Sequence, residues 1–185
     1  MPDPIATLPL QTARLSLRDF VADDWFAVHG YAADADVSRY MDWGPNDATA
    51  TRAYIERVLV AQQEQPRHNY ELAITLRADG RLIGGCGIHV SSPRNREGWV
   101  GYVLGRDQWG QGYATEAARA LLGFGFGPLG LHRIYATCDP RNLASARVME
   151  KIGMRLEGRP REHRWQKGEW RDSLLYAILE HEKSA

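Results

Sequence analysis

The sequence lacks the features that would place the chain in several large classes of protein. It has only two cysteines in 185 residues, Cys86 and Cys138, and they form neither a metal-ligand spacing nor a disulfide framework. Its 23 basic and 23 acidic side chains give a net charge of zero, which argues against a general nucleic-acid binder. No apolar run approaches the roughly 18 residues of a membrane span. We therefore expect no metal, no nucleic acid and no membrane among the partners of this chain.

The beginning of the chain also lacks a visible secretion signal. Met1–Pro4 offers no charged segment followed by an apolar one, so the cytoplasm is the expected compartment. A hydrophobic content of 44% with 25% charged residues is ordinary for a globular protein, and this length is most simply one domain. We expect a single domain over residues 1–185, as a monomer or a homodimer.

Hydrophobic periodicity predicts a mixed α/β (α+β) fold. Alternating apolar residues predict strands at 12–19, 68–77, 81–90, 99–104, 132–139, 161–166 and 169–179. Helical spacing predicts helices at 49–65, 113–127 and 142–152, with a short one from 25, and residues 34–47 and 91–98 are predicted to be loops. This order favours one twisted, mostly antiparallel sheet with about four helices. The strand-helix-strand unit 99–139 places two parallel strands side by side.

One stretch, 99–119, carries the first indication of function. A strand-like segment is followed by Gly110 and Gly112 and then by a run of strong helix formers from Tyr113. Main-chain N–H groups at such a helix start have no partner within the helix, and they bind anions readily. An ordinary strand-to-helix connection has the same pattern. The motifs for nucleoside triphosphates and for dinucleotides are absent or incomplete, so a different phosphate is expected.

Further motifs make the chain resemble a known family. The stretch 99–119 is followed by a second strand, then by Asn142-x-x-Ser145 and by Met-Glu-Lys-Ile-Gly-Met at 149–154. This combination resembles the acetyl-CoA-binding core of GCN5-related N-acetyltransferases, the GNAT superfamily. Trp109, the Tyr-Ala-Thr-Glu-Ala that follows at 113–117, and the beginning Leu10-x-Thr-x-Arg-Leu-x-Leu-Arg resemble its RimJ/RimL branch of ribosomal-protein N-terminal acetyltransferases. The resemblance implies a GNAT fold with a splayed pair of parallel central strands.

The resemblance also implies a binding site for acetyl-CoA. The end of the strand at Val103 and Leu104 is expected to offer main-chain groups to the pantetheine arm, and Asn142 resembles the asparagine that bonds this arm. Asn142 is equally suited to cap the helix that follows it. The diphosphate is expected on the loop that matches the family pattern Gln/Arg-x-x-Gly-x-Gly/Ala: Trp109, Gly110, Gln111, Gly112, Tyr113, Ala114 and Thr115.

Two residues are candidates for the proton transfers of the reaction. The family often uses a tyrosine as the acid, but Met149 occupies that position here, and in the RimL-like branch a serine that matches Ser145 takes its place. The alternative is a small helix serine without a catalytic role. The glutamate of the branch aligns with Arg164, and Glu162 lies two residues earlier as the candidate base. A solvated surface carboxylate is the alternative for Glu162.

The acceptor is expected to be a primary amine. At pH 7 a peptide α-amine is neutralised at a cost of about 1 kcal/mol, whereas a lysine side chain costs about 4.6 kcal/mol. A weak base therefore suffices for an α-amine, and we expect direct acetyl transfer to a protein N-terminus. A small amine, such as an antibiotic or a polyamine, is the first alternative. A regulatory module that binds CoA without turnover is the second.

Overall fold

The computed structural model describes residues 8–183, so Met1–Pro4 and the expectation drawn from it lie outside the described residues. The strands are Leu10–Gln11 (β1), Leu15–Asp19 (β2), Asn69–Leu76 (β3), Leu82–Ser92 (β4), Glu97–Leu104 (β5), Arg133–Cys138 (β6), Arg155–Gly158 (β7), Arg164–Gln166 (β8), Glu169–Arg171 (β9) and Leu174–Leu179 (β10). The α-helices are Trp25–Ala32 (α1), Ala35–Ser38 (α2), Ala48–Ala61 (α3), Tyr113–Phe126 (α4) and Leu143–Lys151 (α5).

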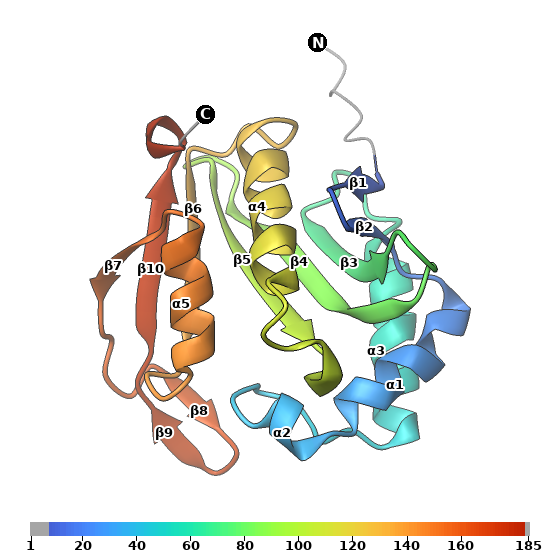
Figure 1. Cartoon of the computed structure of the whole chain (residues 1–185). Coiled ribbons are helices and arrows are strands. Elements are labelled where there is room, and N and C mark those ends of the chain that lie inside the picture. Colours follow the sequence, from blue (N-terminus) through green and yellow to red (C-terminus); the bar gives the residue numbers. More distant parts are fainter. Residues whose placement is uncertain (1–7, 184–185) are drawn as a thin grey trace.

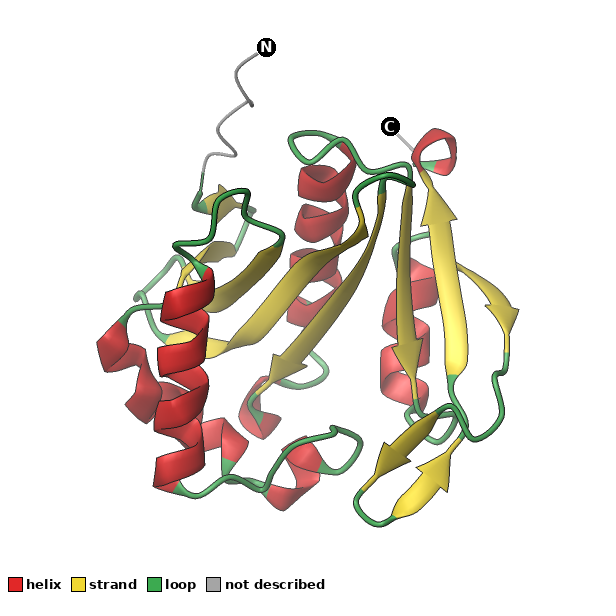
Figure 2. Ribbon diagram, turned by 180° about the vertical axis from the view of Figure 1, so that it is seen from behind, coloured by secondary structure: helices red, strands yellow, loops and turns green. Residues whose placement is uncertain are grey.

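Most of these strands form one sheet, in the order β1-β2-β3-β4-β5-β6-β10-β7, and β8 and β9 form a separate hairpin. Every neighbouring pair in the sheet is antiparallel except β5 and β6. The predicted mixed fold with one parallel pair is therefore confirmed. Figure 1 shows α4 and α5 on one face of this sheet, and Figure 2 shows α3 in front of the other.

Each face of the sheet buries its own apolar cluster. On one face α4 contributes Leu121, Leu122 and Phe124 to the larger cluster, and on the other α3 contributes Ile55 and Val58 to a smaller one. Because helices cover both faces, the central part of β3 and of β4 is buried at consecutive residues rather than at alternate ones. The sheet is thus held between two layers, which fixes the positions of its central strands.

Two predicted loops are shorter in the structure. Residues 34–47 contain the short helix α2, whose first turn is capped by the Asp34 carboxylate accepting the Asp36 N–H at 2.8 Å. The loop predicted at 91–98 was wrong at both ends, because β4 continues to Ser92 and β5 already begins at Glu97. Strand pairing extends these two strands into residues whose polar composition is typical of a loop.

The strand predicted at 169–179 was wrong, because the chain bends in its middle. Asp172 and Ser173 separate β9 from β10, and β10 then enters the main sheet between β6 and β7. The Asp172 carboxylate accepts the N–H of Glu162, and the Ser173 N–H donates to the Pro160 carbonyl, both at 3.0 Å. These bonds to the preceding loop turn the hairpin β8–β9 away from the sheet. The hairpin therefore lies beside the central strands instead of extending them.

Candidate active site

The parallel strands β5 and β6 remain paired for only three residue positions and then diverge. The pairing ends at Trp99 and Tyr135, although β5 continues to Leu104 and β6 to Cys138 (Figure 1). Beyond Trp99, β5 pairs only with β4, so its main-chain groups on the β6 side have no strand partner. An extended ligand can add to such an edge like another strand. The predicted splayed pair is thus confirmed.

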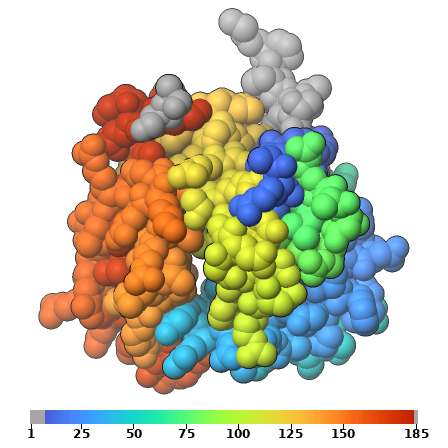
Figure 3. Space-filling view, in the orientation of Figure 1, coloured from blue at the N-terminus to red at the C-terminus, as the bar shows by residue number. Residues whose placement is uncertain are grey.

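The surface is hollowed where this gap opens on the face that carries α4 and α5. Figure 3 shows the depression between the atoms of α5, in orange, and those of α4, in yellow. Val103 and Leu104, the expected pantetheine contacts, lie in the part of β5 that has no partner in β6. The Leu104 carbonyl accepts the indole N–H of Trp109 at 3.0 Å, which ties the glycine loop to the end of β5.

The loop before α4 has the geometry of an anion site. Gly110 and Gly112 have φ values of 76° and 81°, a left-handed conformation that favours glycine. Gly112 is the N-cap of α4 and has no side chain to accept the first N–H groups of the helix. These N–H groups and the positive end of the helix dipole therefore face outward together. The predicted turn and helix start are confirmed, and the bound anion stays a prediction.

Several charged side chains surround this helix start. Arg14 donates to the Gln111 carbonyl at 2.9 Å and to Glu116 at 2.7 Å, while Thr12 donates to the same carboxylate at 2.6 Å. Partial burial works to raise the pKa of Glu116, but the bonds from Thr12 and Arg14 outweigh it and lower the pKa. A groove of about 590 Å³ along this side is lined by Arg14, Arg119 and Lys151. The loop thus opens onto a surface with three cations.

Asn142 and Ser145 lie at the start of α5, as the sequence predicts. The Asn142 side-chain oxygen accepts the Ser145 N–H at 3.1 Å, so the helix-cap interpretation of Asn142 is confirmed. The Ser145 hydroxyl lies 3.1 Å from the hydroxyl of Tyr102, which also contacts the Ser145 carbonyl at 3.1 Å. Sequence analysis missed Tyr102. Met149, where the family often has a tyrosine, is fully buried in the core.

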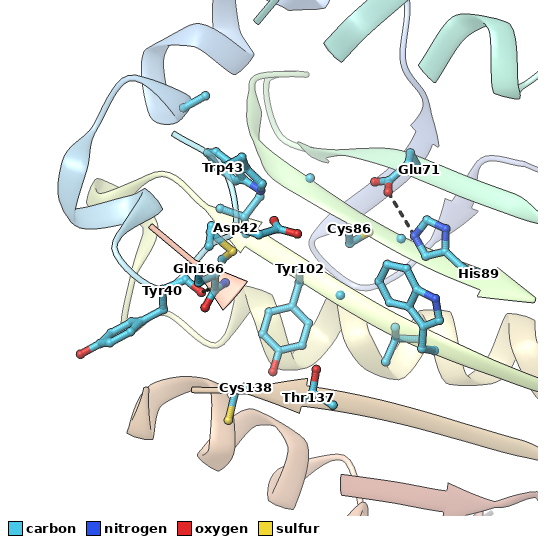
Figure 4. A pocket seen from close by; sticks show the side chains of 18 of the residues that line it. Tyr40, Asp42, Trp43, Glu71, Cys86, His89, Tyr102, Thr137, Cys138 and Gln166 are labelled. Carbon is cyan, nitrogen blue, oxygen red and sulfur yellow. Dashed lines mark hydrogen bonds and ion pairs between the residues drawn. The ribbon is translucent and has the colours of Figure 1, made fainter. Parts of the chain in front are cut away.

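Tyr102 extends from β5 into the gap between the diverging strands. Figure 4 shows its ring reaching toward Thr137 and Cys138 on β6. Burial raises the pKa of Tyr102, so its hydroxyl keeps its proton near neutral pH. Two hydroxyl groups, one from β5 and one from α5, therefore meet beside the gap.

On the opposite face, a cavity of about 670 Å³ opens into the same gap. It is lined by Val100–Val103 of β5 and Tyr135 and Thr137 of β6, and by side chains of α1, α3 and the loop after α2. Its floor includes Gly85 and Gly87 of β4, which carry no side chains above the sheet. The cavity gives a second molecule access to the gap from the side away from α4.

Two titratable residues that sequence analysis did not select as site residues lie on this floor. Glu71 of β3 and His89 of β4 face each other, with Oε1 and Nε2 3.1 Å apart (Figure 4). The Glu71 side chain is 31% exposed, and among the acidic residues of 8–183 that line the cavity it is the one that lies within a strand of the sheet. Neither residue belongs to a recognisable sequence motif, because their proximity arises only from the pairing of β3 with β4.

The hairpin β8–β9 bridges one side of the cavity. Gln166 donates to the Tyr40 carbonyl at 3.4 Å, and the Lys167 ammonium donates to the Ser38 carbonyl at 2.6 Å. Tyr40 and Trp43 line the cavity, whereas Trp165 and Trp170 form an exposed edge-to-face pair outside its lining. The cavity is therefore partly closed by contacts between the hairpin and the loop after α2.

The structure places Glu162 apart from the other candidates. It is exposed, its φ is 48°, and it does not line the cavity, whereas Arg164 does. The role of Glu162 as a base stays a prediction of the sequence.

Cys86 and Cys138 are free and buried, and burial raises the pKa of both thiols, that of Cys138 to about 11. Neither is suited to act as a covalent nucleophile.

Within residues 8–183, no cluster of three or more potential metal ligands is found, and no helix is long and apolar enough to cross a membrane.

The domain model described as "Acetyltransferase (GNAT) domain" matches residues 14–155. The chain belongs to the GNAT acetyltransferase family. It is accordingly an acyltransferase.

Similar proteins carry names that fit this GNAT domain. An "Uncharacterized N-acetyltransferase YnaD" from Bacillus subtilis is 36% identical over 94% of this chain and 98% of its own length. The structure of RimJ from Mycobacterium smegmatis in complex with CoA-disulfide has a TM-score of 0.81 at 28% identity, covering 91% of this chain and 83% of RimJ. A spermidine N(1)-acetyltransferase from Escherichia coli is 23% identical over 91% of this chain and 87% of its own length.

Proposed function

We propose that this GNAT domain transfers the acetyl group of acetyl-CoA directly to a primary amine, and that the acceptor is the α-amine of a protein N-terminus. One observation carries the proposal. The gap between β5 and β6 is reached from both faces of the sheet, through the hollow between α4 and α5 and through the cavity on the other side. Two substrates can therefore meet in the gap without sharing an entrance.

The residues on the α4 side fit the chemistry of CoA. The uncapped N–H groups that follow Gly112 suit a diphosphate, and the unpaired edge of β5 suits the amide-bearing pantetheine arm. Arg14, Arg119 and Lys151 suit the additional phosphate of CoA. RimJ, the relative with a CoA disulfide in its structure, supports the same assignment.

Acetyl transfer requires a proton for the leaving thiolate, and we assign it to Ser145. The hydroxyl of this residue lies beside the gap, and that of Tyr102 is placed to replace its proton from a distance of 3.1 Å. Tyr102 supplies the phenol that the family often places at the position of Met149. Because no thiol is available as a nucleophile, the amine attacks the thioester itself.

The α-amine is favoured as acceptor because its proton is easily removed. Neutralising it at pH 7 costs about 1 kcal/mol, against about 4.6 kcal/mol for a lysine. The name of a relative from Bacillus subtilis, "Putative ribosomal N-acetyltransferase YdaF", which is 27% identical over 79% of this chain, is consistent with a protein acceptor.

One observation favours a small amine as the second candidate. The contacts of Gln166 and Lys167 with the loop after α2 close part of the cavity, and a compact acceptor needs a smaller entrance than a peptide. The name of the spermidine acetyltransferase relative is consistent with this candidate.

A screen with acetyl-CoA tests the proposal. Peptides with different N-terminal residues and blocked lysines are compared with polyamines and aminoglycosides, and release of free thiol is measured. We expect turnover with peptides, with the acetyl group on the α-amine. Higher kcat/KM for small amines would favour the second candidate, and no turnover with any amine would contradict the proposal.

A further inference from the structure

A row of three residues crosses the floor of the acceptor cavity. Glu71 on β3 pairs with Gly87 on β4, and Gly87 pairs with Gly101 on β5. A Cβ atom built on Gly87 would lie only 3.1 Å from Glu71 Oε2. The Glu71 carboxylate therefore extends over β4 and lies above Gly87. Adjacent strands are about 4.8 Å apart, so this carboxylate lies about one strand spacing from Gly101.

Gly101 leaves the space between this carboxylate and the gap open. A Cβ atom built on Gly101 would meet only Trp99 Cζ3, at 3.5 Å. Gly101 belongs to the part of β5 that has lost its pairing with β6, so it borders the gap directly. An amine, or an amine with one water molecule, fits between Gly101 and the Glu71 carboxylate. This geometry meets the distance requirement for proton transfer.

The Glu71 carboxylate is held in place by neighbours on two strands and a helix. His89 Nε2 contacts Oε1 at 3.1 Å, while His89 Nδ1 contacts the Asn69 side-chain oxygen at 3.0 Å. The His89 ring is stacked on Trp99 with its centroid 3.8 Å away. Among the described residues, the one hydrogen-bond contact of Oε2 is a long one of 3.5 Å from the Tyr54 hydroxyl. One carboxylate oxygen is therefore anchored, and the other retains capacity to accept a proton.

We propose that Glu71 is the proton acceptor for the attacking amine and that His89 positions it. The inference rests on the proposed function, because it concerns the acceptor side of the same gap. The amine nitrogen forms a bond to the acetyl carbon, and the C–S bond of the thioester breaks. The amine proton goes to Glu71 Oε2, and the thiolate takes the proton of Ser145. Solvent in the cavity then removes the proton from Glu71, while Tyr102 restores the proton of Ser145 and regains its own from solvent.

Other titratable and charged groups belong to the surroundings of Glu71. They come from each element packed against it and line the same cavity: His89, Tyr54, Tyr31, Cys86 and Arg57. The negative charge of Glu71 contributes to the raised pKa values of three of them, Tyr54, Tyr31 and Cys86. Burial is the larger cause in these three and keeps them protonated near neutral pH. Among the side chains of β3 and β4 that line the cavity within residues 8–183, Glu71 is the one carboxylate.

The test compares Glu71→Gln with the wild type at pH 7 and pH 9, using an N-terminal peptide and acetyl-CoA. We expect kcat to fall about 100-fold at pH 7, as is typical when a general base is removed. The KM for acetyl-CoA stays within about twofold, because Glu71 lies on the acceptor side. The deficit shrinks about tenfold at pH 9, because the neutral fraction of an α-amine rises from about one tenth to about nine tenths.

Three further variants make the test specific. Glu56→Gln, on the exposed side of α3, is the matched control and keeps wild-type kcat. His89→Phe retains a ring against Trp99 but removes Nε2, and it lowers kcat about tenfold with the same recovery at pH 9. Gly101→Ala adds a methyl group to the open space without a close contact, so it folds and still loses at least about tenfold in kcat. The pH-dependent recovery of His89→Phe decides the question if Glu71→Gln does not fold, and a deficit in His89→Phe that is equal at both pH values then overturns the role of Glu71.

The outcomes separate this inference from the function on which it rests. A wild type that acetylates no amine contradicts the proposed function, and the role of Glu71 as a base then falls with it. An active wild type with kcat of Glu71→Gln within threefold, or with a deficit that is equal at both pH values, overturns only the role of Glu71. A loss of kcat in Glu162→Gln that recovers at pH 9, with none in Glu71→Gln, assigns the base to Glu162 instead.

Discussion

Asp139, the residue after β6, offers a quantitative test of how the site is held together. Its side chain is only 3% exposed, and its carboxylate accepts bonds from Arg141 at 2.7 and 2.9 Å and from Arg171 at 3.2 Å. These contacts join the end of β6 to the start of α5 and to the hairpin β8–β9. The bonds from Arg141, opposed by burial and assisted by Arg171, lower the pKa of Asp139 to about 2.

This pKa predicts how much Asp139 contributes to the free energy of unfolding. The difference between the ordinary value of 3.8 and about 2 corresponds to about 2 kcal/mol. Because the pKa is lower in the folded state, the contribution is complete above about pH 4 and is lost as the pH falls from 4 toward 2. At pH 3 about half of it remains.

Urea unfolding of Asp139→Asn, followed by tryptophan fluorescence, measures this contribution. We expect the variant to be less stable than the wild type by about 2 kcal/mol at pH 7 and by about 1 kcal/mol at pH 3. Asp23→Asn, at an exposed position, is the matched control and stays within about 0.5 kcal/mol of the wild type. A difference below 0.5 kcal/mol at pH 7, or an equal difference at both pH values, would refute the reasoning.

Two other substitutions test the transfer site and the glycine loop. Ser145→Ala is expected to lower kcat about 100-fold with little change in the KM for acetyl-CoA, measured by thiol release, and a loss of less than threefold would remove Ser145 as the acid. Gly112→Ala forces alanine into a left-handed conformation at about 1 kcal/mol and is expected to weaken CoA binding at least about tenfold by calorimetry. Gly80→Ala, with φ of 74° in a distant hairpin, is its control: it carries the same strain and retains CoA affinity, and equal affinities would contradict the role of the loop.

The sequence predicted the parts of the site that depend on local chemistry. Gly110 and Gly112 predicted a left-handed turn because glycine adopts this conformation without steric cost, and the structure has it at both positions. Asn142 predicted a helix cap because its side chain reaches an N–H three residues later. The parallel pair β5–β6 followed from the helical connection between two apolar strands.

Other parts depend on residues that are far apart in the chain and could not be predicted in this way. Tyr102 meets Ser145 across 43 positions, and neither residue signals the other in the sequence. Glu71 and His89 become neighbours only through the register of β3 with β4. The bend between β9 and β10 results from bonds of Asp172 to a preceding loop, whereas the apolar residues on either side of it are typical of one continuous strand.

A crystal structure of the protein with CoA and an acceptor peptide tests the central claim most directly. We predict that the diphosphate lies on the N–H groups that follow Gly112 and that the pantetheine arm runs along β5 beyond Trp99. The thiol then lies in the gap beside Ser145, and the peptide amine approaches it from the side of Glu71. CoA bound away from the gap, or a thiol without access to the acceptor cavity, would contradict the account.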